Sequence, residues 1–99
     1  MSPSPFEQRM WKVVEQLADG EVVSFGDVAG RAGKPKASRA AGRMLSKIRD
    51  GDLPWWRVVY SDGKLPSCRP SVQTERLEAE GVSVENGRVI AAPMGRFEQ

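Results

Sequence analysis

Histidine is absent from this 99-residue sequence, and cysteine occurs once, as Cys68. Without histidine, the chain lacks the commonest general base and the commonest metal ligand of proteins. A single cysteine excludes an intrachain disulfide, which is typical of a reducing compartment, and it also argues against a zinc site. We therefore expect no catalytic residue, no metal ion and no cofactor.

Long apolar runs are missing as well. No segment approaches the ~18 consecutive apolar residues of a membrane span, and the first ten residues, MSPSPFEQRM, lack the apolar stretch of a signal peptide. The hydrophobic content of 39% and the charged content of 28% are ordinary for a globular protein. The sequence thus predicts a cytoplasmic protein with no membrane partner. Its length fits a single domain over residues 1–99, in the simplest case a monomer.

Positive charge is concentrated in the middle of the chain, although the net charge is only +2. No acidic residue lies between Asp27 and Asp50. That interval contains seven basic residues: Arg31, Lys34, Lys36, Arg39, Arg43, Lys47 and Arg49. A basic segment of this kind indicates a surface for a polyanion such as nucleic acid, although a solvated basic helix would have the same composition.

Three helices are predicted in the first half of the chain. The sequence SPFE at 4–7 combines a capping serine, a proline suited to the first turn and a nearby glutamate, and this helix would end by Gly20. Ser24 and Asp27 mark a second helix start. After a turn that contains glycine and proline, a third helix is predicted over 37–48.

The third predicted helix has a basic ridge, because Arg39, Arg43 and Lys47 lie four residues apart. Its small residues Ala40 and Ala41 face inward on this spacing, whereas Gly42 lies close to the ridge, so the backbone there could approach a groove closely. A short helix, a tight turn and a basic second helix form a helix-turn-helix pattern.

The second half of the chain is less helical. We predict a short strand at 56–60, a helix at 71–80 and a β-hairpin at 82–90, whose Asn86-Gly87 pair is a strong turn signal. The tail from about residue 91 is expected to be loose. Together these elements predict a mostly α fold with small β elements, as a single winged-helix-like domain that contains the helix-turn-helix.

Two adjacent tryptophans stand in the sequence LPWWRVV at 53–59. Neighbouring residues of a strand point to opposite faces, so Trp55 and Trp56 cannot both fill the same core. One of these large rings therefore needs another role. For Trp55, both the wall of a binding cavity and an ordinary core position remain open on this reasoning.

Five short segments occur in a fixed order: GEVVSFGDVA at 20–29, SRAAG at 38–42, PWWRVV at 54–59, SDG at 61–63 and RLEAEG at 76–81. In this order and at these separations they resemble the DNA-binding domain of the O6-alkylguanine-DNA alkyltransferases. Each segment alone is a weak signal, but the ordered set is specific. The resemblance covers most of the chain, from about residue 6 to residue 84.

Two departures from the family pattern bear on function. Trp55 stands where the family has its nucleophilic cysteine, and an indole carries no thiolate that could accept an alkyl group. Trp56 replaces the assisting histidine, so Glu80, which matches the glutamate that orients it, would have nothing to orient. Tryptophan in the cysteine position marks the alkyltransferase-like proteins of this family. The resemblance implies a non-enzymatic sensor that binds O6-alkylguanine in double-stranded DNA and attracts nucleotide excision repair proteins.

Residue roles also follow from the resemblance. The helix at 37–48 is expected in the minor groove, with Arg39 as an arginine finger that fills the space left by a flipped base. The implied pocket for that base comprises Phe25, Trp55, Trp56, Val59, Tyr60 and Ser61. The implied contacts to the DNA backbone come from Ser24, Lys34, Lys36, Ser38, Arg43 and Lys47. Phe25 stands where the family has a tyrosine, so one hydroxyl is missing, and Arg57 is expected to form a structural ion pair.

Three other interpretations are compatible with parts of the sequence. A helix-turn-helix transcription regulator that reads DNA sequence in the major groove explains the basic helix but not the PWWRVV segment. An enzyme could use Cys68 instead, and that thiol would then acquire a stable adduct. In a protein-interaction module, both tryptophans would form an exposed anchor patch.

Overall fold

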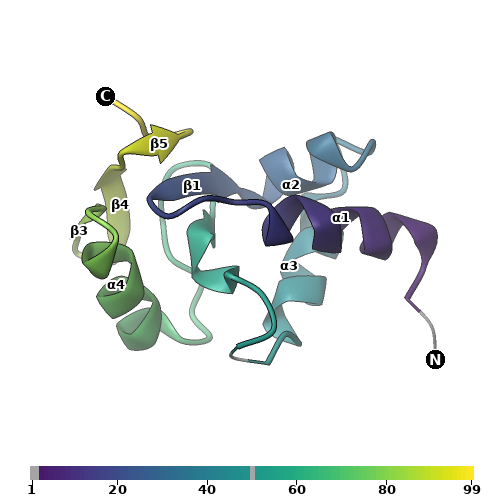
Figure 1. The fold of residues 1–99 in the computed structure, drawn as a ribbon, viewed down its shortest axis with the longest axis horizontal. Coiled ribbons are helices and arrows are strands. Elements are labelled where there is room, and N and C mark those ends of the chain that lie inside the picture. The colour runs from purple at the N-terminus through teal and green to yellow at the C-terminus, as the bar shows by residue number, and fades with distance from the viewer. Residues whose placement is uncertain (1–2, 50) are drawn as a thin grey trace.

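The computed structural model describes residues 3–49 and 51–99. Figure 1 shows the predicted mixture of helices with short strands, so the expected fold class is confirmed. The elements are α1 (Pro5–Glu15), β1 (Glu21–Ser24), α2 (Phe25–Arg31), α3 (Ser38–Ser46), the 3-10 turn η1 (Trp55–Arg57), β2 (Val58–Val59), α4 (Pro70–Ala79), β3 (Ser83–Glu85), β4 (Arg88–Ala91) and β5 (Met94–Gly95). The helix-turn-helix consists of α2, the turn after it and α3.

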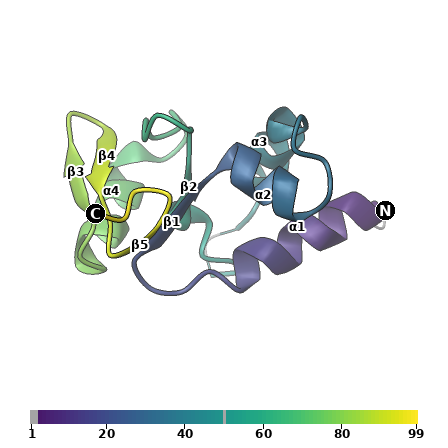
Figure 2. The same cartoon turned by 90° about the horizontal axis from the view of Figure 1, so that it is seen from above.

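The parallel strands β1 and β2 separate two halves of the molecule (Figure 2). On one side lie α1, α2 and α3, and on the other lie α4 and the antiparallel hairpin of β3 and β4. Successive strand residues face opposite sides. Val23 and Val58 accordingly belong to the hydrophobic cluster under the three helices, whereas Val22 and Val59 belong to the cluster beside α4.

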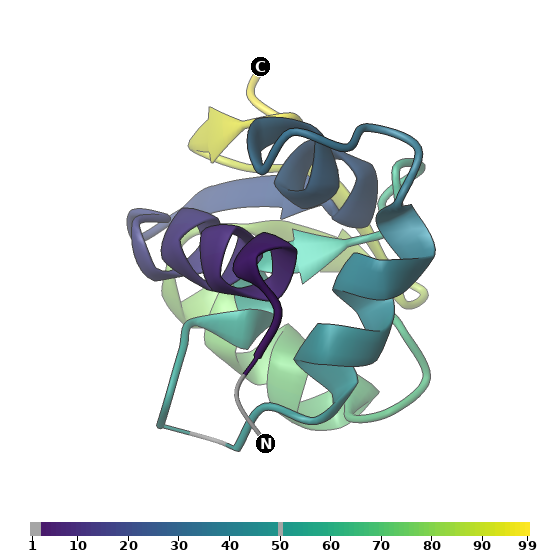
Figure 3. The same cartoon turned by 90° about the vertical axis from the view of Figure 1, so that its right-hand side faces the viewer.

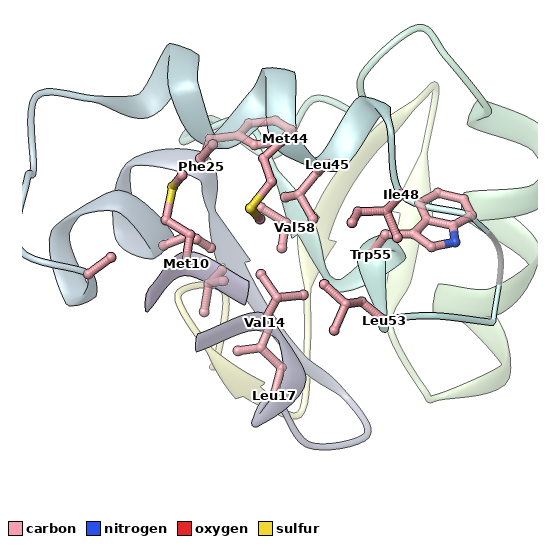
Figure 4. Packing of buried hydrophobic residues seen from close by; sticks show 14 residues of the cluster. Met10, Val14, Leu17, Phe25, Met44, Leu45, Ile48, Leu53, Trp55 and Val58 are labelled. Atoms are coloured by element: carbon pink, nitrogen blue, oxygen red, sulfur yellow. The ribbon is translucent and has the colours of Figure 1, made fainter. Parts of the chain in front are cut away.

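The larger cluster is built on helical spacing. Met10 and Val14, one turn apart on α1, are fully buried. Met44 and Leu45 of α3 face them from across the cluster, and Trp55 lies toward its edge (Figure 4). Figure 3 looks onto α1, with α2 and α3 arranged around it. This packing leaves the opposite face of α3 exposed.

Both predicted helix starts are confirmed as capping boxes. The Ser4 hydroxyl accepts a hydrogen bond from the Glu7 backbone N–H at 3.1 Å, and the Glu7 carboxylate accepts one from the Ser4 N–H at 3.3 Å. Ser24 and Asp27 make the same reciprocal pair at 3.0 and 2.9 Å. These bonds satisfy backbone donors that the first turn of a helix leaves without partners.

The predicted strand at 56–60 is partly wrong. Trp55, Trp56 and Arg57 form a 3-10 turn, and only Val58 and Val59 are extended. Strand alternation therefore does not determine the directions of the two tryptophans. Their rings nevertheless diverge, because the two planes meet at 87° with centroids 6.0 Å apart.

The expectation of a loose tail is also wrong. Strand β5 pairs in parallel with β1, and the sheet order is β2-β1-β5. Ala92 is buried, and the Arg96 backbone N–H donates to the Val22 carbonyl at 2.9 Å. Neither β1 nor β5 was predicted. A strand of two residues has no periodicity to read, and β1 is a short run buried by both halves of the molecule.

Two further features concern the described part of the chain only. Across residues 3–49 and 51–99, no helix has the length and apolarity that a membrane crossing would need. Within the same ranges, no three His, Cys, Asp or Glu residues are grouped as they would be around a metal ion.

Gly95 allows β5 to lie close to β1, because a side chain at this position would collide with β1. Its φ is +87°, and an added Cβ would overlap the carbonyl oxygen of Val22. Gly95→Ala should therefore separate the strands and lower the free energy of unfolding by more than about 1 kcal/mol. Gly87→Ala is the matched control, because Gly87 also has a positive φ, +74°, but beyond its two chain neighbours no described residue has an atom within 4 Å of an added Cβ. Urea unfolding of both variants measures the difference, and equal midpoints would show that β5 adds no stability.

Candidate nucleic-acid interface

The basic ridge of α3 points to solvent. Arg39 and Arg43 are exposed, while Ala41, Met44 and Leu45 are buried against the helical half of the molecule. Lys47, the third residue of the ridge, is also exposed, and further exposed polar residues flank the ridge: Lys34, Lys36 and Ser38. The ridge thus presents positive charge on the second helix of a helix-turn-helix, the element that enters a DNA groove in such motifs.

A hollow of about 380 Å³ lies beside this ridge, and we call it the outer cavity. It is lined by Phe25, Ser38, Arg39, Gly42, Arg43, Tyr60, Pro66, Ser67 and Cys68. Tyr60 is half exposed, and its ring meets Phe25 edge to face at 5.2 Å. Aromatic and cationic side chains therefore meet at one opening beside the basic helix.

A smaller hollow of about 40 Å³, the inner cavity, lies deeper under α3. Its lining comprises Phe25, Gly42, Leu45, Ser46, Trp55, Val58, Pro66, Cys68, Arg69 and Gln73. Phe25, Gly42, Pro66 and Cys68 line both cavities, so the two are neighbours along one path. Trp55 is only 6% exposed, so it is a core residue and a cavity wall at once.

Three arginines lie over the tryptophan pair, and one of them, Arg57, is 5.2 Å from the Trp56 ring. The Arg69 guanidinium lies over the Trp55 ring at 3.8 Å, and that of Arg76 lies 5.0 Å from the Trp56 ring. Such cation–π contacts stabilise by about 0.5–2 kcal/mol, depending on desolvation. Neither Arg69 nor the cavity residue Gln73 was predicted from the sequence as part of the site. Arg69 precedes the predicted helix at 71–80, and Gln73 lies within it. Their spacing in the sequence does not indicate which side chains or cavities they contact.

Trp56 points away from the inner cavity. It lines a separate hollow of about 460 Å³, together with Arg57 and Arg76. Its indole N–H donates to a Glu80 carboxylate oxygen at 2.8 Å. Glu80 therefore does orient a ring at this position, and the expectation that it would have nothing to orient is wrong.

Arg57 lies at the centre of a buried polar network. It is 8% exposed, and its Nε donates to both Glu80 carboxylate oxygens at 2.9 and 3.2 Å. Nη1 donates to the Leu17 carbonyl at 2.7 Å, and Nη2 bonds to Asp19. The expected ion pair of Arg57 is confirmed. Burial alone would lower the pKa of Arg57, but the two carboxylates outweigh it and raise the pKa above its ordinary value.

Glu80 completes the network. It also accepts the Gly20 backbone N–H at 2.8 Å, so one carboxylate joins α4, the tryptophan turn and the start of β1. Burial by itself would raise the pKa of Glu80. Hydrogen bonds from Arg57, Gly20 and Trp56 outweigh burial, and the pKa of this carboxyl lies below its usual value.

The sequence of this chain matches a known protein family. Residues 5–82 match the family model described as "6-O-methylguanine DNA methyltransferase, DNA binding domain". The chain belongs to this family. The resemblance predicted from the five ordered segments is thereby confirmed. Strands β3, β4 and β5 lie beyond the matched region.

The sequences of several relatives align with most of this chain. A "DNA base-flipping protein" of Escherichia coli strain K12 is 43% identical over 88 residues, which cover 86% of this chain and 68% of that protein. A protein of the same name from Vibrio parahaemolyticus is 35% identical, covering 85% of this chain and 88% of the relative. The crystal structure of S. pombe Atl1 in complex with damaged DNA containing O6-carboxymethylguanine is similar with a TM-score of 0.77 at 28% identity, over 86% of this chain and 83% of that chain.

The other predicted site residues of this family member lie in different places. Val59 is fully buried in the cluster beside α4 and lines neither cavity. Ser61 is exposed in the turn after β2, where its carbonyl accepts a hydrogen bond from the Arg96 side chain at 3.0 Å. Ser24 is 2% exposed, and its hydroxyl caps α2. Of the predicted pocket residues, the structure therefore brings Phe25 and Trp55 together at the inner cavity but does not place Trp56, Val59 or Ser61 there. Ser24, predicted to contact the DNA backbone, is buried instead.

Glu80 should control stability in acid. Its pKa is lower in the folded state than the unfolded value of about 4.3. Its contribution is therefore fully present above that pH and is lost as the pH falls through the folded-state pKa. Glu80→Gln should lower the free energy of unfolding by about 3 kcal/mol at pH 7, because it leaves the buried Arg57 charge without its main partner.

Urea unfolding between pH 7 and pH 3 checks this expectation. Glu80→Gln should show a flatter decline of stability in acid than the unmodified protein. Glu78→Gln, at an exposed position of the same helix, is the control and should change stability little. Parallel acid profiles for the unmodified protein and Glu80→Gln would contradict the role of this carboxylate.

Proposed function

We propose that this protein is a non-enzymatic sensor that binds O6-alkylguanine in double-stranded DNA, receives the flipped base in its cavity and marks the site for nucleotide excision repair. The observation that carries the proposal is the position of Trp55, an indole that walls the inner cavity beneath the basic helix α3. The indole offers a flat apolar face but no thiolate to take up the alkyl group.

The proposed DNA complex uses the exposed face of α3. This helix enters the minor groove, and Arg39, at the rim of the outer cavity, fills the gap left by the flipped base. Phosphates are held by exposed polar residues on and before the helix: Lys34, Lys36, Ser38, Arg43 and Lys47. The complex of S. pombe Atl1 with damaged DNA containing O6-carboxymethylguanine supports the binding of damaged DNA by this fold.

Selectivity for the lesion has two sources in this proposal. Flipping a base costs a few kcal/mol, and less where alkylation has weakened the pair. The inner cavity then adds about 0.8 kcal/mol for each methylene that it buries against Phe25, Leu45 and Trp55. At about 40 Å³ the cavity holds little more than one water molecule, so a base must widen it, and the Arg69 side chain over Trp55 is the group that it displaces.

Cys68 supports a second candidate function, alkyl transfer to its thiol. It is exposed and lines both cavities, so an alkyl group could come near it. No histidine is present in the chain to act as its base. We therefore favour binding without transfer, and the mass of the protein distinguishes the two functions.

The decisive experiment compares two duplexes, one with a single O6-methylguanine and one with guanine at the same place. The proposed sensor binds the first more tightly, and mass spectrometry afterwards finds both protein and DNA unchanged. A mass increase on Cys68 would establish transfer instead. Equal affinity for the two duplexes, together with preference for one sequence, would favour a transcription regulator. Stimulation of lesion incision by a reconstituted excision-repair system tests the signalling step.

Arg39 and Arg43 should have separable effects, although both are exposed arginines one turn apart on α3. Arg39→Ala should weaken binding to a lesion-containing duplex about tenfold or more, with a much smaller effect on the same lesion in single-stranded DNA, since only the duplex needs its gap filled. Arg43→Ala should weaken binding to damaged and undamaged duplexes alike and reduce the salt slope by about one. Fluorescence anisotropy at several salt concentrations measures both effects. If Arg39→Ala behaves like Arg43→Ala, Arg39 only contacts phosphate.

Gly42 should allow the backbone of α3 to approach DNA closely, because glycine has no side chain. It lies within the helix and lines both cavities, and apart from its own helix no residue of the described ranges has an atom within 4 Å of an added Cβ. Gly42→Ala should therefore stabilise the fold by about 0.5–1 kcal/mol, as expected inside a helix, and yet weaken DNA binding. Gly30→Ala is the control, because that helix position of α2 has room for a methyl group and lines neither cavity. Undiminished DNA affinity in Gly42→Ala would show that the backbone of α3 does not approach the duplex there.

A further inference from the structure

The amide of Gln73 holds an acceptor without a partner. Gln73 of α4 is 1% exposed, and its Nε2 donates to the carbonyl oxygens of Trp56 at 3.0 Å and Val58 at 3.1 Å. Its Oε1 is the one buried side-chain oxygen or nitrogen in the described ranges without a hydrogen bond. Leaving such an atom unsatisfied costs about 1–3 kcal/mol, and native proteins rarely do so.

The orientation of this amide follows from its neighbours. The carbonyls of Trp56 and Val58 can only accept hydrogen bonds, so the NH₂ group must face them. An amide turned round would set its oxygen against two other oxygens. Oε1 is therefore the unpaired atom, and only a donor can satisfy it. Gln73 lines the inner cavity, so a molecule that enters there can bring that donor.

The chemistry of an O6-alkylated guanine limits which donor this can be. Alkylation at O6 fixes the ring in the form that carries no proton on N1. The exocyclic 2-amino group is then the only N–H donor left on the base. We infer that Oε1 of Gln73 accepts a hydrogen bond from the 2-amino group of the flipped base, an inference that rests on the proposed function. Trp55 then supplies the flat wall of the cavity, and Gln73 reads the edge of the base.

The inference makes the 2-amino group a condition of tight binding. Two duplexes test it, one with O6-methylguanine and one with O6-methylhypoxanthine, because these bases differ only in that group. The unmodified protein should bind the first about tenfold more tightly, as expected when a buried acceptor is left unpaired. A base without the amino group forms a weaker pair and costs less to flip, so a preference for O6-methylguanine cannot come from the flipping step and reports the unsatisfied Oε1.

Gln73→Lys assigns the effect to this residue. An ammonium can still donate to the Trp56 and Val58 carbonyls, but it has no acceptor. This variant should bind the two duplexes equally. Gln16→Lys, at an exposed position, adds the same charge elsewhere and should keep the tenfold preference. The quantity to compare is the ratio of each protein's affinities for the two duplexes, as in a double-mutant cycle. A change in affinity that is equal for both duplexes leaves this ratio unchanged.

The outcomes separate this inference from the proposed function. If the protein prefers O6-methylguanine to guanine but binds O6-methylhypoxanthine equally well, the reading of the amino group is overturned and the sensor function stands. A tenfold preference retained in Gln73→Lys also overturns it, because another group would then read the amine. If the protein does not distinguish O6-methylguanine from guanine, the proposed function itself fails.

A measurement on the unmodified protein covers the case in which Gln73→Lys does not fold. The side-chain amide resonances of Gln73 in a ¹⁵N-labelled sample should shift when the O6-methylguanine duplex is added, and clearly less with the O6-methylhypoxanthine duplex. Identical shifts with both duplexes would overturn the inference.

Discussion

The buried contact between Arg57 and Glu80 determines where both tryptophans lie. Arg57 reaches the loop after α1 through the Leu17 carbonyl, and Glu80 holds the start of β1 through Gly20. Trp56 is tied to the same carboxylate, so the 3-10 turn can rotate little about its own axis. Trp55 is thereby directed to the opposite side, toward α3. A buried ion pair adds modestly to stability, but losing one partner is expensive, so this contact specifies one arrangement of the turn.

The parallel pair of β1 and β2 has a similar effect on a larger scale. It gives each half of the molecule its own hydrophobic cluster, with Val23 and Val58 on one side and Val22 and Val59 on the other. Trp55 lies in the turn immediately before β2, and the Gln73 side chain of α4 donates to the Val58 carbonyl of β2. The inner cavity is therefore assembled from elements of both halves, and α3 covers it from the solvent side.

Local chemistry explains which features could be predicted from the sequence. The helix starts at Ser4 and Ser24, the basic ridge of α3 and the hairpin are encoded within a few residues, and the structure has all of them. Strands β1 and β5 were missed because their pairing joins segments about seventy residues apart. The same limit applies to the site. Motif order identified Trp55, whereas the positions of Val59, Arg69 and Gln73 relative to the cavity depend on packing that no local pattern records.

The edge-to-face geometry of the two indoles has an optical consequence. Two chromophores with centroids 6.0 Å apart and planes at 87° couple their electronic transitions, and the coupling changes steeply with ring orientation. The third indole, Trp11, lies exposed on α1 and contributes a separate signal. Near-ultraviolet circular dichroism of the unlabelled protein is thus sensitive to small rotations of Trp55 against Trp56. The molecule carries an intrinsic spectroscopic reporter at the wall of its own cavity.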